Sequence, residues 1–172
     1  MVKCFVRIKP SGTKDKFVFP SKHYNKFDKI FDENTNSNDV YKEIVSAGKL
    51  STIVFYGQTN TGKTYTSSYI IKKLLFSENV SIRAMEIYNN DCYDLLNNRH
   101  KVSKLQQCVC NRIKASKDGH KAFNCIKSTK IVKNNGSNKF SSRSHIIYEI
   151  VANKVTYIIV DLAGMELVVN NE

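Results

Sequence analysis

The sequence predicts an α/β fold in which helices flank a mixed central β-sheet, and three patterns support this. Residues 53–56 are an apolar segment followed by a glycine-containing loop and an amphipathic helix, which is a strand–loop–helix succession. Residues 146–151 and 155–160 are apolar segments joined by a short connection, which predicts an antiparallel hairpin. Residues 157–160 are continuously apolar, which is typical of a strand buried on both faces inside a helix-covered sheet.

The elements before the loop are a strand, a hairpin and a helix. Residues 2–9 predict the strand, which ends at Pro10, and residues 17–31 predict the hairpin. Ser37 or Asn38 is the expected N-cap of the helix. The expected apolar face and the expected end of this helix are Val40, Tyr41, Ile44 and Val45, and then Gly48.

The loop is followed by a helix that we expect to run from Lys63 to about Phe76. Residues 81–88 then predict a strand, and residues 91–96 a turn or a short helix. Residues 97–130 carry little pattern of either kind. The hairpin completes a mixed sheet in a layered fold.

Length and charge restrict the setting. A chain of 172 residues fits a single domain over residues 1–172. Its 27 Lys and Arg against 15 Asp and Glu give a net charge of +12, which favours nucleic acid, anionic lipid or an acidic protein surface as partner. The lysines are scattered, so charge alone leaves this choice open, and a lysine-rich proteome explains them equally well.

Cysteine usage and hydropathy favour an intracellular protein without a membrane partner. The five Cys form no C-x-x-C pair, so they indicate neither a zinc site nor a disulfide framework. The N-terminus lacks the apolar segment of a signal peptide, and no run approaches eighteen apolar residues. We therefore expect a soluble protein in the cytosol or nucleus.

Residues 57–64 satisfy the phosphate-binding pattern G-x-x-x-x-G-K-[ST] between a strand and a helix. Gly57 and Gly62 let backbone N–H groups converge on phosphate oxygens, and the start of the helix points its positive dipole end at the anion. Lys63 is expected to reach the β and γ phosphates, and Thr64 to ligate Mg²⁺. The predicted nucleotide-binding residues are Gly57, Gln58, Thr59, Asn60, Thr61, Gly62, Lys63 and Thr64.

A second motif, D-L-A-G, follows the apolar run and has the form of a Walker B site. Asp161 would hold the hydration shell of Mg²⁺, and Gly164 would offer its N–H to the γ-phosphate. An Asp at a strand end also commonly caps a helix or forms a turn. The phosphate loop favours the metal interpretation.

A third motif is the polar cluster at residues 138–145, N-K-F-S-S-R-S-H, which leads into a strand. Ser142 could complete the Mg²⁺ shell, and Ser141 could orient the attacking water. Arg143 could pair with Glu166 when a triphosphate is bound. A solvated serine-rich loop with a surface Arg is the alternative.

With these motifs in order, the chain resembles the kinesin motor domain family. Family chains carry R-x-R-P, F-D-x-x-F, G-Q-T-x-x-G-K-T, E-I-Y with D-L-L, N-x-x-S-S-R-S-H and D-L-A-G-S-E. The corresponding segments here are residues 7–10, 27–31, 57–64, 86–96, 138–145 and 161–166. The resemblance covers nearly the whole chain.

The resemblance implies an ATPase of the P-loop type that uses ATP and Mg²⁺ and associates with microtubules in the cytoplasmic cytoskeleton. Arg7 and Pro10 would flank the adenine, and Tyr65 stands where the family often has a His facing the base. Asn138 would join Lys63 at the phosphates. Ser141, Arg143, Gly164 and Glu166 would serve catalysis, the Arg143–Glu166 salt bridge closing the site around the attacking water.

Three departures qualify the resemblance. Lys9 replaces the second Arg of R-x-R-P, and Met165 replaces the Ser of D-L-A-G-S-E. The chain ends at Glu172, where the family continues through its main microtubule-binding elements, so the resemblance predicts an incomplete motor domain.

Two alternatives to a motor ATPase follow from these departures and from the charge. One is a non-motile nucleotide-binding or regulatory remnant of a kinesin head. The other is a P-loop protein acting on nucleic acid, which the polar-cluster motif argues against, so no nucleic-acid partner is expected. The oligomeric state is not predicted.

Overall fold

The computed structural model describes residues 2–9, 26–46, 52–77, 79–130 and 144–165. They belong to two compact units, Met1–Ala47 and Gly48–Glu172. The assignment of residues 1–172 to a single domain stays a prediction.

The first unit contains a small parallel sheet. β1 (Phe5–Arg7) pairs with β2 (Lys29–Phe31), and Val6 lies opposite Ile30. The first strand is therefore shorter than predicted. Of the predicted hairpin at residues 17–31, only residues 26–31 are described, and their strand runs parallel to β1.

The helix of the first unit, α1 (Ser37–Tyr41), continues as a π-helical turn, η2 (Lys42–Ser46). Asn36 caps it, because its Oδ1 accepts hydrogen bonds at 3.0 Å from the N–H groups of Asn38 and Asp39. The prediction of Ser37 or Asn38 as N-cap is wrong, since the side chain one residue earlier reaches both amides. Three of the four residues of the predicted apolar face are buried, namely Val40, Ile44 and Val45. Gly48, the predicted helix end, lies outside the described residues.

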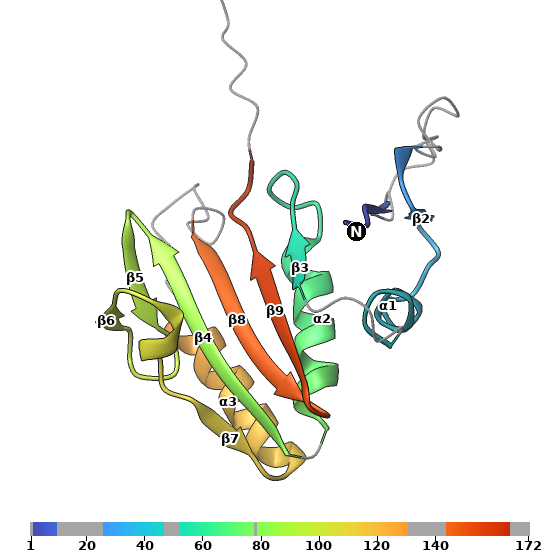
Figure 1. The fold of residues 1–172 in the computed structure, drawn as a ribbon. Coiled ribbons are helices and arrows are strands. Elements are labelled where there is room, and N and C mark those ends of the chain that lie inside the picture. Colours follow the sequence, from blue (N-terminus) through green and yellow to red (C-terminus); the bar gives the residue numbers. More distant parts are fainter. Residues whose placement is uncertain (1, 10–25, 47–51, 78, 131–143, 166–172) are drawn as a thin grey trace, which may run out of the picture. The chain divides into compact units, whose positions relative to one another are not determined.

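The second unit is a mixed sheet with helices on one face (Figure 1). The strands follow the order β3-β9-β8-β4-β5-β6, and β7 pairs with β4 beside β5. β3 is parallel to β9, and the other pairs are antiparallel. The strands are β3 (Thr52–Phe55), β4 (Val80–Tyr88), β5 (Asp91–Asp94), β6 (His100–Val102), β7 (Asn111–Ile113), β8 (His145–Ala152) and β9 (Val155–Asp161). The predicted mixed sheet is confirmed.

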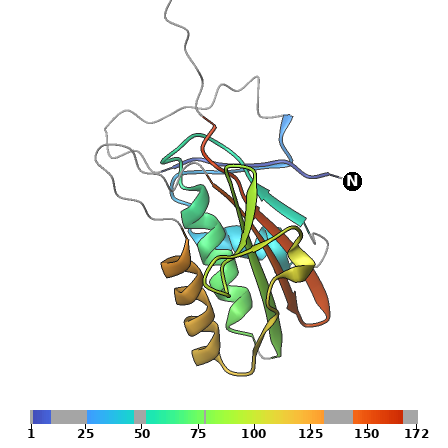
Figure 2. The same ribbon diagram turned by 90° about the vertical axis from the view of Figure 1, so that its left-hand side faces the viewer.

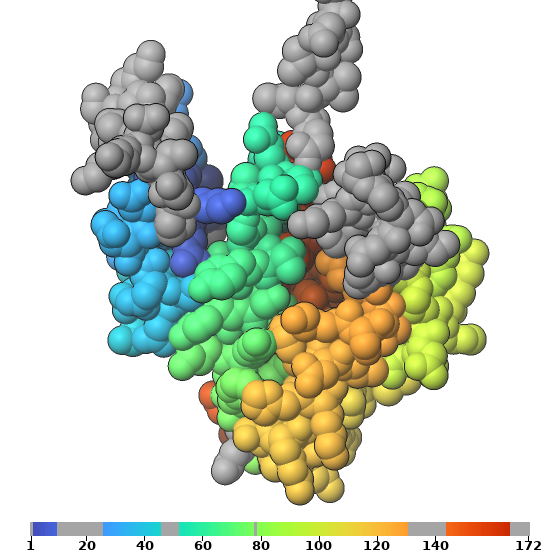
Figure 3. Space-filling model, turned by 180° about the vertical axis from the view of Figure 1, so that it is seen from behind, coloured from blue at the N-terminus to red at the C-terminus, as the bar shows by residue number. Residues whose placement is uncertain are grey.

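Two helices, α2 (Lys63–Leu75) and α3 (Ser116–Thr129), lie side by side on the same face of the sheet, as the views from the side and from behind show (Figures 2 and 3). Alternate residues of the central strands bury apolar side chains beneath them, such as Ile82 and Ile150 at 0% exposure. At Gly119 the helices approach so closely that a Cβ atom would lie 2.5 Å from the carbonyl oxygen of Leu75. Among the described residues, no helix is long and apolar enough to cross a membrane.

Two tight turns explain both a correct and an incorrect prediction. Asn153 and Lys154, with φ of 51° and 65°, connect β8 to β9 in the antiparallel hairpin that the sequence predicted. Asn89 and Asn90, with φ of 50° and 67°, connect β4 to β5 in the same way. The prediction of a turn or short helix at residues 91–96 is therefore wrong for residues 91–94, which form β5, and correct for residues 95–96, which lie in the turn after it. Asn tolerates the positive φ that a two-residue hairpin needs, so β5 begins directly after Asn90.

The unpatterned stretch, residues 97–130, contains short strands and one helix. β6 and β7 have three residues each, and η3 (Leu105–Gln107) is a single 3₁₀ turn. The fourteen-residue α3 completes it. Three-residue strands are too short to display alternation, so no pattern in the sequence indicates them.

Candidate functional site

The phosphate loop connects β3 to α2 within the second unit. Gly57 and Gly62 have φ of 145° and 93°, values that residues other than glycine rarely adopt. A Cβ atom at Gly57 would also lie 3.1 Å from Thr61 Oγ1. The Thr61 hydroxyl donates to the carbonyl oxygen of Gln58 at 2.8 Å, which closes the loop into a compact turn. Both glycines of the predicted motif are thus required by the backbone.

The N-terminus of α2 is arranged like an anion site. Gly62 caps the helix without a side-chain hydrogen bond. The first N–H groups of any helix have no acceptor within it, and together with the dipole they favour an anion. The Lys63 ammonium lies at the same place, where it donates to the carbonyl oxygens of Gly57 at 2.8 Å and Gln58 at 2.6 Å.

Asp161 lies beside this helix start, as its position after the apolar run predicted. The parallel pairing of β3 with β9 places Asp161 opposite Phe55, so the phosphate loop and the carboxylate leave neighbouring strand ends. Thr64 Oγ1 donates to Asp161 Oδ2 at 2.9 Å. Asp161 is 3% exposed, and its Oδ1 has no hydrogen-bond partner among the described residues. The structure therefore brings together two of the three predicted metal ligands.

The negative charge of this region affects a neighbouring phenol. Burial raises the pKa of Tyr148, and the carboxylates of Asp161 and Glu86 raise it further. Tyr148 lies on β8 between the strands that carry these two acids. The Tyr148 phenol therefore ionises only at a higher pH than an exposed tyrosine does.

The segment after Asp161 is held against the phosphate loop by its backbone amides. Leu162 N–H donates to the carbonyl oxygen of Phe55, and Met165 N–H to that of Gly57, both at 3.2 Å. Ala163 N–H donates to Nδ1 of His145 at 3.0 Å. Gly164, the predicted γ-phosphate contact, lies between these attached amides.

The other predicted site residues divide into three groups. Tyr65 is 69% exposed on α2, and Gln58 and Asn60 are exposed while Thr59 is half-buried. Arg7 lies in the first unit, where its guanidinium donates to Thr35 O at 3.3 Å and Ser37 Oγ at 3.1 Å. The remaining predicted residues lie outside the described residues, and their roles stay predictions: Pro10, Asn138, Ser141, Ser142, Arg143 and Glu166.

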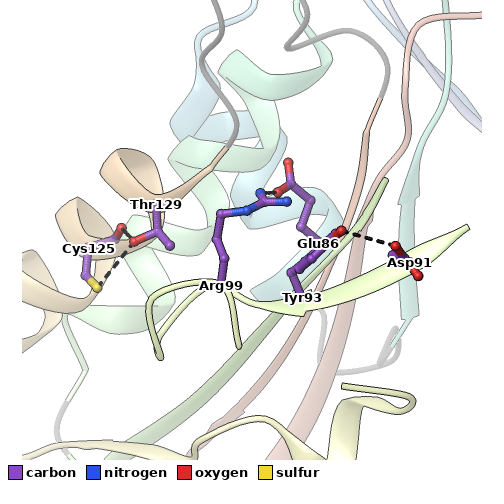
Figure 4. Close-up of polar contacts among 6 residues, drawn as sticks. All are labelled: Glu86, Asp91, Tyr93, Arg99, Cys125 and Thr129. Carbon is purple, nitrogen blue, oxygen red and sulfur yellow. Dashed lines mark hydrogen bonds and ion pairs between the residues drawn. The ribbon is translucent and has the colours of Figure 1, made fainter. Parts of the chain in front are cut away.

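Two acids of the E-I-Y and D-L-L segments have structural partners that the sequence did not reveal. Glu86 is fully buried and forms an ion pair with Arg99, which reaches it from the turn after β5 (Figure 4). The Arg99 guanidinium also lies 4.2 Å from the centroid of the Tyr93 ring. Asp94 accepts hydrogen bonds from the N–H groups of Leu96 at 2.9 Å and Val109 at 2.7 Å. Acidic residues within apolar segments were the available signal, because a buried charge needs a partner.

Comparison of the sequence with known protein families identifies the family of this chain. The family model for the kinesin motor domain matches residues 68–172. This chain belongs to the kinesin motor domain family. It is 28% identical over 169 residues to Kinesin-like protein KIN-13B of Arabidopsis thaliana, covering 81% of this chain and 25% of that protein. It is 29% identical over 191 residues to Kinesin-like protein KIP3 of Saccharomyces cerevisiae, covering 81% and 24%. The kinesin-like chain thus spans about a quarter of the length of these curated relatives.

Solved structures share the kinesin fold. The Drosophila kinesin family member NOD in complex with AMPPNP has a TM-score of 0.70 and 22% identity, covering 98% of this chain and 73% of that one. NOD docked with bovine tubulin into a map of nucleotide-free NOD complexed to the microtubule has a TM-score of 0.67 and 23% identity, covering 98% and 72%. At this level of identity the similarity establishes the fold, which confirms the predicted kinesin-like layered architecture.

Proposed function

We propose that this kinesin-family chain binds ATP with Mg²⁺ at the phosphate loop and hydrolyses ATP as a microtubule-associated motor protein. The strongest support is the 2.9 Å contact between Thr64 and Asp161 at the start of α2. A hydroxyl and a buried carboxylate next to a helix N-terminus form the donor set that a magnesium–phosphate complex needs. Solved NOD structures contain AMPPNP, or manganese with ADP, which supports the same ligand class.

The residues present fit Mg²⁺. The buried Oδ1 of Asp161 has no partner among the described residues, and it can accept a hydrogen bond from a metal-bound water. Thr64 would bind the ion directly, and Ser142 would complete the protein ligands. The ion would neutralise charge on the phosphate oxygens.

Hydrolysis in this proposal is a matter of positioning, without a covalent intermediate. The backbone of residues 57–62 and the Lys63 ammonium would hold the phosphates together with Asn138. Ser141 would orient the attacking water, and the Gly164 N–H would contact the γ-phosphate. Arg143 and Glu166 would pair to close the site. At the adenine, Arg7 and Pro10 would flank the base, and Tyr65 would face it.

Microtubules are the proposed partner, and the cytoplasmic cytoskeleton is the proposed location. The net charge of +12 is complementary to an acidic protein surface such as that of tubulin. The solved NOD complex with the microtubule supports this partner for the family.

The test is steady-state ATP hydrolysis by the purified chain, with and without microtubules, at low ionic strength where basic contacts are strongest. Stimulation by microtubules supports a motor ATPase. Hydrolysis without stimulation, or nucleotide binding without hydrolysis, identifies instead a non-motile nucleotide-binding protein. Absence of Mg·ATP binding refutes the proposal as a whole.

A further inference from the structure

The segment that follows Asp161 is attached at three of its four backbone amides, each to a different element. Leu162 N–H is bound by β3, through the carbonyl oxygen of Phe55. Ala163 N–H is bound by His145 at the start of β8, and Met165 N–H by Gly57 of the phosphate loop. These contacts define the path of residues 162–165 over the loop.

Gly164 N–H differs from its neighbours. No acceptor for this amide lies among the described residues, whereas the amides on both sides of it are bound. A peptide held on both sides has little freedom to rotate, so the direction of the Gly164 N–H follows from the anchors at Ala163 and Met165. A donor whose direction is fixed in advance stabilises developing charge at no reorganisation cost.

We propose that His145 is a positioning residue, which orients the Gly164 N–H toward the γ-phosphate by holding the amide of Ala163. This inference rests on the proposed ATP site but concerns a residue that the site assignment does not include. His145 touches neither the phosphate nor the metal in this proposal. It acts through the peptide next to the one that donates.

His145 is the anchor that depends on amino-acid identity. The other two acceptors are backbone carbonyls, which any residue at those positions supplies. The imidazole accepts at Nδ1, so its proton must be on Nε2. His145 is also the last residue of the polar cluster at residues 138–145, so the start of β8 connects this cluster to the D-L-A-G segment.

Two amide substitutions separate positioning from a general packing role. In His145→Asn, Oδ1 is separated from the backbone by the same number of bonds as Nδ1 and can accept the Ala163 N–H. In His145→Gln, the oxygen takes the place of Nε2 and points past that amide. His145→Ala removes the acceptor altogether.

The first readout does not depend on nucleotide. Amide hydrogen exchange at Ala163, measured by NMR on the nucleotide-free chain, should be about tenfold faster in His145→Ala and His145→Gln than in the wild type, since a lost hydrogen bond of about 1.4 kcal/mol corresponds to that factor. His145→Asn should remain close to the wild type. Equal exchange in all four proteins overturns the proposed contact, whether or not the chain hydrolyses ATP.

The second readout is catalytic and rests on the proposed function. Loss of one preorganised donor lowers kcat by about 100-fold, so misorienting it should lower kcat at least about tenfold in the Ala and Gln variants. Their affinity for Mg·ADP should change less than about threefold, and His145→Asn should recover most of the rate. Equal kcat losses in Asn, Gln and Ala, or parallel losses in ADP affinity, overturn the positioning role. If the wild-type protein does not hydrolyse ATP, the proposed function is refuted. His145 is then tested by comparing the affinities of the wild type and the variants for AMPPNP and for ADP, because only the triphosphate analogue has a γ-phosphate that can contact the Gly164 N–H.

Discussion

Removing the Arg99 side chain should destabilise the second unit strongly, because it leaves the Glu86 carboxylate buried without a counter-charge. Glu86 is 0% exposed, and its Oε1 already lacks a partner among the described residues. Breaking a buried ion pair by deleting one partner costs about 3–5 kcal/mol, and the loss of the contact with the Tyr93 ring adds about 0.5–1 kcal/mol. Because the Arg99 side chain is 22% exposed, water can reach the vacated position, so we expect about 3 kcal/mol for Arg99→Ala.

The positive φ at position 99 does not contribute to the expected loss of stability. Arg99 has a φ of 61°, and alanine carries the same steric cost there as arginine because both have a Cβ atom. Glu86→Gln removes the charge that needs a partner, so the double variant should be less destabilised than the sum of the single variants by at least about 1 kcal/mol.

The chain supplies a matched control in Arg83, which pairs with Glu149 across β4 and β8. In that pair the acid is 16% exposed and the arginine 28%, so it lies between surface and buried ion pairs, and Arg83→Ala should cost about 1–2 kcal/mol. Urea unfolding followed by circular dichroism gives the free energies directly. Equal losses for Arg99→Ala and Arg83→Ala, or strict additivity with Glu86→Gln, would show that burial of Glu86 does not determine the energetics.

Three further predictions follow from single contacts. Gly119→Ala places a Cβ atom 2.5 Å from the Leu75 carbonyl oxygen, so overpacking of about 1–3 kcal/mol should exceed the helix-propensity gain of about 1 kcal/mol and lower the melting temperature. As a control, Asn124→Ala at an exposed position of α3 should leave the stability unchanged or raise it. If Gly119→Ala has the same effect, α2 and α3 do not approach each other as closely as the structure shows. Burial and then Asp94 raise the pKa of the Cys108 thiol from 9.0 to about 11, so alkylation of Cys108 at pH 8 should be much slower than that of the exposed Cys110. Comparable alkylation of Cys108 and Cys110 would refute the burial of Cys108. Since the pKa of the Cys108 thiol is higher in the folded than in the unfolded state, this thiol contributes stability below pH 9 that is lost as the pH rises toward 11. Lys63→Ala should abolish Mg·ATP binding by calorimetry with an unchanged circular dichroism spectrum, whereas unaltered affinity would exclude the phosphate loop as the binding site.

The parts of the fold that the sequence predicted are those with local signals. The strand–loop–helix around the phosphate loop was correct because glycine spacing and helical periodicity are both visible within about twenty residues. The β8–β9 hairpin was correct because its strands are long enough to show their apolar pattern. The strand β5 was missed because Asp91–Asp94 is largely polar, and its only signal was the Asn89–Asn90 turn.

The contacts that the sequence could not predict join residues far apart in the chain. His145 and Ala163 are eighteen positions apart, and Arg99 meets Glu86 across a turn with two residues at positive φ. Neither pair belongs to a periodic pattern. Such partners become visible only when the register of the strands is known.

That register connects the core of the second unit to its candidate site. Tyr157, Ile159 and Asp161 alternate along β9 toward the helices and are 8%, 0% and 3% exposed. A slip of one residue would turn Asp161 to the opposite face and place Val160 next to Thr64. The apolar residues that α2 and α3 bury therefore also determine which side chain faces the start of α2. Because the same slip would move Ala163 away from His145, the pairing of β8 with β9 controls both the carboxylate and the peptide that carries the Gly164 N–H.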